Sequence, residues 1–151
     1  MLHPAHLYRL ILLPSYWTRY PTGQEFIVQS IVGINHGGLG VIPWDDPTSS
    51  DIKASASTLA LALPKMTPFI LNPSATFRQT LTSDLVDIGL WTVGSQTLVL
   101  LTNTKYQATT VELGSLGLKG SVTQVLDSGA ELIEGGISLT SVGSGGFIVG
   151  Y

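Results

Sequence analysis

Residues 37–46 read GGLGVIPWDD and lie between two runs that have the periodicity of α-helices. Within this segment, residues 39–44 are almost wholly apolar and show no alternation of polar and apolar side chains. That pattern is typical of a strand covered on both faces, as in a parallel sheet. The order of helix, buried strand and helix predicts a piece of an α/β fold, and we expect most of its sheet to lie outside this chain.

The run before this segment, residues 22–32 (TGQEFIVQSIV), is predicted to be a helix. Thr22 and Glu25 have the S/T-x-x-E spacing of a capping box, in which each side chain accepts a hydrogen bond from the other residue's free backbone N–H. The apolar residues that recur at helical spacing on one face are Ile27, Ile31 and Ile34. An apolar run at residues 8–13 precedes this helix, so residues 8–44 predict a right-handed βαβ unit.

The run after the segment, residues 48–63, repeats the helical arrangement. Thr48 and Asp51 provide a start, and Pro64 is expected to end the helix because it has no backbone N–H. The apolar residues on one face are Ile52, Ala56, Leu59 and Leu63. The first part of the chain is therefore predicted to be an incomplete βαβα segment.

The second half of the chain has a different pattern of residues. Residues 64–74 (PKMTPFILNPS) contain three prolines and no helical period, which predicts an interdomain connection. Short apolar runs with glycine-rich turns follow, and they predict an antiparallel β-sandwich, with the most apolar run at its centre. The expected strands are residues 77–81, 86–93, 96–102, 108–113, 121–126, 132–133, 137–142 and 147–151. We therefore expect an α/β part at residues 1–70 and a β-sandwich domain at residues 71–151.

The composition argues against several classes of partner. The net charge is −3 and only 7 residues are Lys or Arg, without a cluster, which argues against nucleic acid. The chain has no cysteine, so disulfides and thiolate metal sites are excluded. The histidines His3, His6 and His36 do not complete a ligand set, and we expect neither a metal nor a cofactor. No run approaches the ~20 apolar residues of a membrane span, so no membrane partner is expected.

The order of these elements resembles the C-terminal end of fungal TIM-barrel glycoside hydrolases. The resemblance rests on an aromatic loop, a PTG-x-E helix start, a GGLG strand that ends in Trp44, a small-residue helix that ends in Leu-Pro, a proline-rich link and a β-rich end. It implies that residues 8–13 are the seventh barrel strand, residues 39–44 the eighth, and residues 48–63 the last barrel helix. Residues 77–151 are then similar to the all-β domain that often follows such barrels.

The resemblance implies a chemistry that this chain does not complete. Such hydrolases use two carboxyl groups that flank the glycosidic bond, ~5–9.5 Å apart, and in many of these barrels they lie at the ends of strands four and seven. Strand four is absent, and no acidic residue lies between Met1 and Gly23, where the carboxylate of strand seven would fall. We therefore assign no catalytic residue and expect no hydrolysis by this chain alone.

The resemblance also implies a former sugar site at the end of the last barrel strand. The residues assigned to substrate binding are Trp44, Asp45, Asp46, Tyr16 and Trp17. That end of a barrel strand faces the active site, and an indole face stacks on the C–H surface of a sugar ring. The alternative is that Trp44 is a core residue and that the two aspartates turn the chain before Pro47. The sugar site is favoured for an intact barrel, and the alternative for this chain alone.

Three functional hypotheses are compatible with the sequence. The first is a non-catalytic C-terminal portion of a glycoside-hydrolase-like protein, with an accessory β-sandwich and a remnant of a carbohydrate site. The second is a secreted fungal binding module, lectin-like or cell-stimulating and immunomodulatory, that acts without catalysis. The third is a structural β-protein that self-associates as a homo-oligomer through exposed barrel elements, because unpaired strands leave free edges. The parent family implies an extracellular location and a carbohydrate partner.

Overall fold

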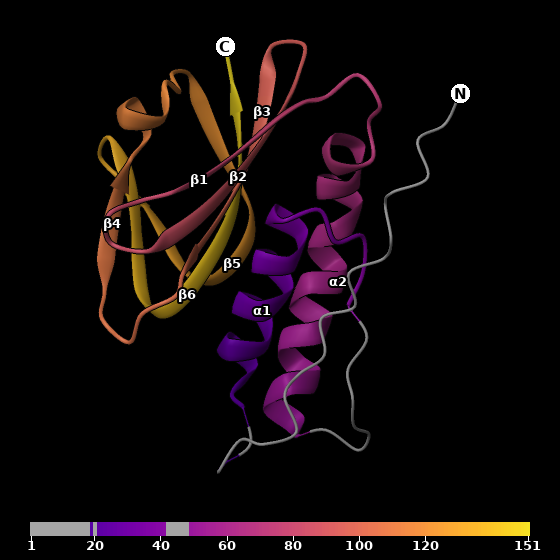
Figure 1. Ribbon diagram of the computed structural model, residues 1–151, viewed down its shortest axis with the longest axis vertical. Coiled ribbons are helices and arrows are strands. Elements are labelled where there is room, and N and C mark those ends of the chain that lie inside the picture. Colours follow the sequence, from indigo (N-terminus) through magenta and orange to yellow (C-terminus); the bar gives the residue numbers. More distant parts are fainter. Residues whose placement is uncertain (1–18, 20, 42–48) are drawn as a thin grey trace.

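The computed structural model of the protein describes residue 19 and residues 21–41 and 49–151. Two helices precede a β-sheet, and the described elements follow one another in the order seen in Figure 1. They are α1 (Gly23–Asn35), α2 (Ser50–Ile70), β1 (Thr76–Leu81), β2 (Val86–Val93), β3 (Gln96–Asn103), β4 (Thr109–Glu112), the 3-10 helix η1 (Leu113–Leu116), β5 (Ser121–Ile133) and β6 (Gly136–Gly150). The strand expected at residues 8–13 lies outside the described residues, as do residues 42–44 of the one expected at 39–44. The described start of that run was predicted wrongly: residues 39–41 follow the turn after α1 as a loop, form no strand, and leave Leu39 62% exposed.

Helix α1 begins with the predicted capping box. The Glu25 backbone N–H donates to Thr22 Oγ1 over 3.2 Å, and the Thr22 N–H donates to Glu25 Oε2 over 2.8 Å. The helix runs three residues beyond its predicted end, to Asn35, because Ile34 and Asn35 are both buried. For α2, the capping side chain is Ser49 rather than Thr48, and its hydroxyl accepts from the Ile52 N–H over 3.3 Å.

The prediction that Pro64 ends the second helix was wrong. Helix α2 continues through Pro64 and Pro68 to Ile70. Both prolines lie on the exposed side of the helix, whereas Met66 and Phe69 are buried on its inner side. A proline removes one ladder hydrogen bond, but burial of these two large side chains holds the helix together on its other side. The predicted proline-rich connection at 64–74 therefore shrinks to residues 71–75. No helix among the described residues is long and apolar enough to cross a membrane.

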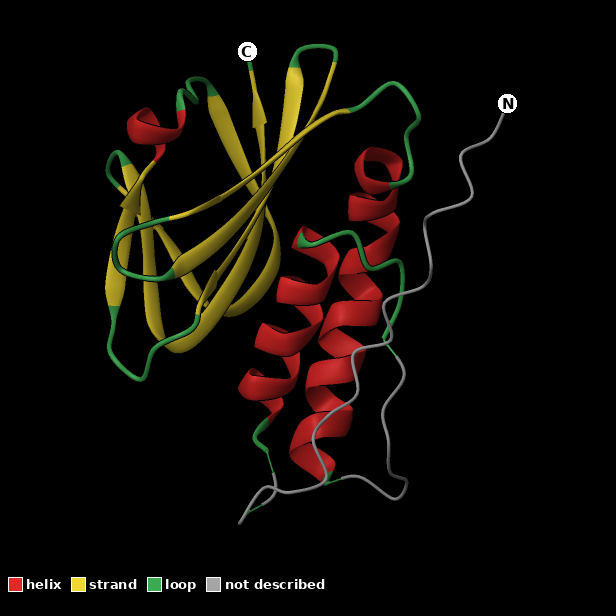
Figure 2. Cartoon of the chain, viewed as in Figure 1, coloured by secondary structure: helices red, strands yellow, loops and turns green. Residues whose placement is uncertain are grey.

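The strands form one six-stranded antiparallel sheet rather than the two stacked sheets of a sandwich. Its order is β1-β2-β3-β6-β4, and β5 pairs with the whole length of β6. On the other edge of β6, β4 pairs with residues 136–139 and β3 with residues 144–150. Because β6 changes partner along its length, the sheet curls into the half-barrel seen in Figure 2. The most apolar run, β3, lies at the middle of the strand order, as predicted.

Glycines that suggested turns lie inside the last two strands. The predicted runs 121–126 and 132–133 are one strand, β5, and the runs 137–142 and 147–151 merge into β6. A Cβ added at Gly145 would collide with Ala130 and the ring of Phe147, so glycine there permits close packing rather than a turn. Gly129, with φ of +88°, lies at an irregularity in the β5–β6 pairing, which explains how a turn signature fits within a strand.

Each face of the curled sheet covers its own hydrophobic core. Alternate residues of β3 serve the two cores, with Val99 and Leu101 on the concave side and Leu98 and Leu100 on the convex side. The two helices lie against the convex face in Figure 1. The convex core combines helix and sheet residues, namely Phe26, Ile27, Ile31, Ile34, Ile52, Leu59, Ala62, Met66, Phe69, Trp91, Leu98, Leu100 and Leu126. The convex core therefore contains residues from both sides of residue 70. The division into two domains at that residue stays a prediction.

Candidate functional site

Both helices begin at the same end of the molecule. In Figure 1 they run side by side in the same direction, and the Gly23 N–H donates to Asp51 Oδ2 over 2.5 Å, which ties the two starts together. The segments predicted to bind sugar directly precede these two starts in the chain. Those residues, Tyr16, Trp17, Trp44, Asp45 and Asp46, lie outside the described residues, so their assignment stays a prediction. The described part of this end is built around Glu25.

The Glu25 carboxylate is buried, and both of its oxygens accept hydrogen bonds. Arg19 donates from Nη1 to Oε2 over 2.9 Å and from Nη2 to Oε1 over 2.6 Å, while Tyr106 Oη donates to Oε1 over 2.5 Å. With the capping bond from Thr22, four donors surround a carboxylate whose side chain is 5% exposed. The cluster links the start of α1 to the loop between β3 and β4.

These donors determine the protonation state of the cluster. The hydrogen bonds from Arg19 are the largest cause that holds the pKa of Glu25 at about 2, and those from Tyr106 and Thr22 lower it further. The bond to Glu25 raises the pKa of the Tyr106 hydroxyl and that of the Arg19 guanidinium. A general acid needs a pKa near the working pH, and a nucleophilic carboxylate needs a free oxygen. Glu25 has neither property, so its role is structural.

A second buried carboxylate anchors the opposite end of α1. Asp87 of β2 is 4% exposed and accepts from Asn35 Nδ2 over 2.7 Å and from Gln79 Nε2 over 3.1 Å. Asn35 contacts Oδ1 of this carboxylate, whereas Oδ2 accepts from Gln79 and also lies 2.6 Å from His36 Nε2. Asn35 also donates to the Leu100 carbonyl over 3.2 Å. The end of the helix is thereby fixed to two neighbouring strands.

Three further residues take clear positions here. His36 caps α1 and pairs with Asp87. No cluster of three metal-binding side chains occurs in the described part of the chain. Trp91 is a core residue, and its ring centroid lies 4.8 Å from that of Phe77. Tyr106 is 65% exposed.

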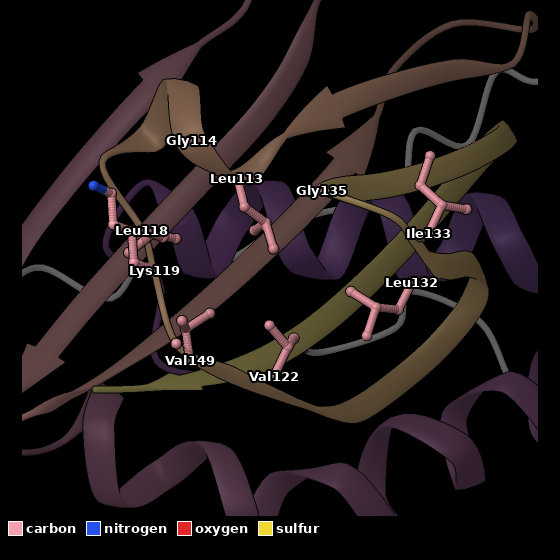
Figure 3. A pocket seen from close by; sticks show the side chains of 10 residues that line it. Leu113, Gly114, Leu118, Lys119, Val122, Leu132, Ile133, Gly135 and Val149 are labelled. Carbon is pink, nitrogen blue, oxygen red and sulfur yellow. The ribbon is translucent and has the colours of Figure 1, made fainter.

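The concave face holds a cavity of about 410 Å³, shown in Figure 3. It lies between the β5–β6 hairpin and the segment that follows β4. Its lining is aliphatic side chains, three glycines and one lysine: Leu113, Leu118, Val122, Leu132, Ile133, Val149, Gly114, Gly120, Gly135 and Lys119. The lining contains no carboxylate, hydroxyl, amide or aromatic side chain, so the cavity has the chemistry of a hydrophobic binding site and not of a sugar hydrolase.

Sequence reasoning missed both carboxylate clusters. Glu25 was recognised as a helix cap, but its pairing with Arg19 and Tyr106 joins residues 81 positions apart in the chain. Asp87 carried a detectable signal, because it is the one charged residue in the otherwise apolar strand VDIGLWTV. A buried charge must be paired, and that requirement predicts donors on the element that covers the strand.

No protein-family model matches this sequence, and no curated protein sequence is significantly similar to it. Solved structures do resemble the fold. A debranching enzyme from Nostoc punctiforme superposes with a TM-score of 0.53 at 15% identity, over 94% of this chain and 35% of that one. An Anoxybacillus α-amylase, described as a glycosyl hydrolase, gives 0.52 at 13% identity, over 82% of this chain and 32% of that one.

At these identities the likeness concerns the fold alone. The fold of this chain is similar to a part of each of these two enzymes. It spans about a third of the length of each of these two enzymes.

Proposed function

We propose that the chain is a non-catalytic, β-rich portion of a glycoside-hydrolase-like protein, with a remnant of a carbohydrate site where its helices begin. The observation that carries this proposal is the state of the two buried carboxylates in the described residues. Glu25 and Asp87 each accept several hydrogen bonds from side chains that hold α1 on the sheet. Glycosidic hydrolysis requires a pair of carboxyl groups free to face substrate, and these two are committed to structure.

The relation of the helices supports a barrel remnant as the origin of the first part. Neighbouring helices that run in parallel require the chain to return along their length between them. Helix α1 is ~20 Å long, and the connection at residues 36–49 is long enough to make that return. In a βαβα unit the return is made by a strand, whereas residues 39–41, the described part of the return in this chain, form a loop in which Leu39 is 62% exposed.

The two sugar-site segments are compatible with one location. Residues 16–17 and 44–46 directly precede α1 and α2, whose starts are tied together by Gly23 and Asp51. We propose that an oligosaccharide binds there by stacking on Trp44, outside the cell. The matched test compares Trp44→Ala with Tyr151→Ala, which removes a 64%-exposed aromatic at the C-terminus. Binding measured by a glycan array and calorimetry should be lost in the first variant and kept in the second.

The absence of catalysis has its own test. Purified chain should release no product from aryl-glycosides or polysaccharides above a heat-treated control. Dose-dependent hydrolysis that a single carboxylate substitution abolishes would overturn the non-catalytic role.

A second candidate function is self-association, favoured by exposed apolar residues on α2. Leu61 is 80% exposed, and Leu63, nearer the buried face of the helix, is 37% exposed. Light scattering during size exclusion should show a dimer or larger species that Leu61→Gln converts to monomer. A monomer at high concentration excludes this role.

A further inference from the structure

We propose that the cavity on the concave face binds an aliphatic chain that carries an anionic head group, such as the carboxylate of a medium-chain fatty acid. Its volume of about 410 Å³ lies within the roughly 300–1,000 Å³ of small-molecule pockets. The site is independent of the carbohydrate role proposed above, because the cavity and the helix starts lie on opposite faces of the sheet.

The aliphatic side chains of the cavity come from two separate parts of the fold. Leu113 and Leu118 belong to the segment after β4 and are buried in the concave core, as is Val149 of β6. On the other side, Leu132 of β5 remains 43% exposed although it pairs with Ile137 of the concave core and points to the same face. The next residue, Ile133, is 40% exposed and lies at the edge of the cavity. A half-exposed leucine beside buried aliphatic residues gains from being covered by an apolar ligand.

Part of the cavity rim is formed by residues without side chains. A Cβ added at Gly114 or at Gly135 would have no heavy atom within 4 Å, so the space beside both glycines is unfilled. Gly114 lies in η1 and Gly135 in the β5–β6 turn, and the Leu113 backbone N–H donates to the Gly135 carbonyl over 3.1 Å, which joins the two segments. This hydrogen bond fixes the rim, and the glycines leave room beside it for an apolar ligand.

The charges around the cavity determine the orientation of the ligand. Lys119 is the one charged residue of the lining, and it forms no ion pair among the described residues. Figure 3 shows Lys119 at one end of the cavity, with its amine directed outward, and Ile133 at the other end. The second end is flanked in sequence by Glu131 and Glu134. An anionic head is thus attracted to the lysine end and repelled from the hairpin end.

The lining also distinguishes this ligand from a sugar. Sugar sites present planar aromatic faces and polar side chains that match several hydroxyl groups, and the cavity has neither. Its one polar side chain matches one charged group, and its six aliphatic side chains match methylene groups.

A chain-length series tests the assignment directly. Hexanoate, octanoate and decanoate, each below its micelle concentration, are titrated into the full chain by calorimetry at constant ionic strength. Affinity should increase about fourfold for each added methylene that is buried. Decylammonium has the same tail and the opposite charge, and it should bind more weakly than decanoate.

Two variants and two controls locate the ligand. Lys119→Gln should weaken all three acids by a similar factor, about two- to fivefold, because it removes one exposed charge contact. Leu132→Gln should weaken decanoate but leave hexanoate unchanged, since only the longer tail reaches the hairpin end. The matched controls, Lys53→Gln on the exposed side of α2 and Leu71→Gln directly after that helix, should change neither.

Three outcomes overturn the assignment. The first is no measurable binding of decanoate. The second is decylammonium that binds as tightly as decanoate, which removes the role of Lys119. The third is loss of binding in Leu71→Gln with none in Leu132→Gln, which places the ligand at the end of α2 instead.

Discussion

The two faces of the curled sheet are filled in different ways. The convex face is covered by two helices whose apolar side chains interlock with Leu98 and Leu100, and α1 is fixed at both of its ends by buried carboxylates. The concave face is covered by the sheet's own curl and by the short segment around η1. The second arrangement leaves a cavity beside a half-exposed leucine, Leu132.

The difference shows how one strand pattern serves two purposes. Strand β3 places apolar residues on both faces with equal burial. A separate helical layer, held by paired charges, buries Leu98 and Leu100 on its face completely. On the concave face, the short segment around η1 contributes fewer side chains than two helices do. Space therefore remains there that a ligand can occupy. We expect the convex face to determine stability and the concave face to bind.

The largest expected effect is on the convex core. Leu100→Ala removes a fully buried side chain and should lower the free energy of unfolding by about 3 kcal/mol. Leu132→Ala, on the rim of the concave cavity, should lower it by less than about 1 kcal/mol. Chemical denaturation of both variants measures the difference, and equal losses would contradict the comparison of the two faces.

The next effect concerns the polar anchor at the end of α1. Asn35→Ala removes the amide that donates to Asp87 and to the Leu100 carbonyl, leaving a buried carboxylate short of one donor. We expect a loss of about 2 kcal/mol. The control Asn72→Ala disrupts only a side-chain bond within an exposed turn and should cost well under about 1 kcal/mol. A smaller loss for Asn35→Ala than for the control would show that this anchor is dispensable.

The anchor at the start of α1 predicts a pH dependence. The pKa of Glu25 is about 2 in the folded protein, below its usual ~4.3 when unfolded, so its contribution is fully present above pH ~4.5 and is lost as the pH falls toward 2. Because Arg19 is half exposed, we expect a contribution of only about 2 kcal/mol. Stability of Glu25→Gln should vary less with pH across this interval, whereas the exposed Glu131→Gln should keep the native profile. Equal profiles for native protein and Glu25→Gln would refute the anchor.

The smallest effect is expected from the tyrosine that completes this anchor. Tyr106→Phe keeps the exposed ring and removes the hydroxyl that donates to Glu25. A loss of about 1 kcal/mol is expected, together with a rise in the pKa of Glu25, because one stabilising donor is gone. Tyr151→Phe, at the C-terminus, is the control and should change neither.

Local signals in the sequence predicted most elements of the fold. The start of α1 was predicted from the capping box of Thr22 and Glu25, which are three residues apart. Strands β2 and β3 were predicted from continuous runs of apolar residues. Both signals depend only on neighbours in the chain, and all three elements formed as expected. The failures occurred where distant packing outweighs a local signal. Pro64 failed to end α2 because Met66 and Phe69 are buried beyond it. The glycines of β6 suggested turns because their close contacts with β5 cannot be read from one strand.

The candidate sites depended even more on distant contacts. Glu25 meets Tyr106, and Asn35 meets Asp87, only because the helices lie on the convex face. The cavity arises from the curl of the sheet, for which single-strand periodicity has no signature. The predicted sugar-site residues, by contrast, came from a resemblance to a family, and they lie outside the described residues.

The central claim is that the buried carboxylate at the helix starts is structural and not catalytic. The most direct test is a titration of the Glu25 carboxyl carbon by nuclear magnetic resonance, with its signal assigned by its absence in Glu25→Gln. We predict a pKa of about 2, as its four hydrogen bonds require. A pKa of ~6, in the range of a general acid, would contradict the account.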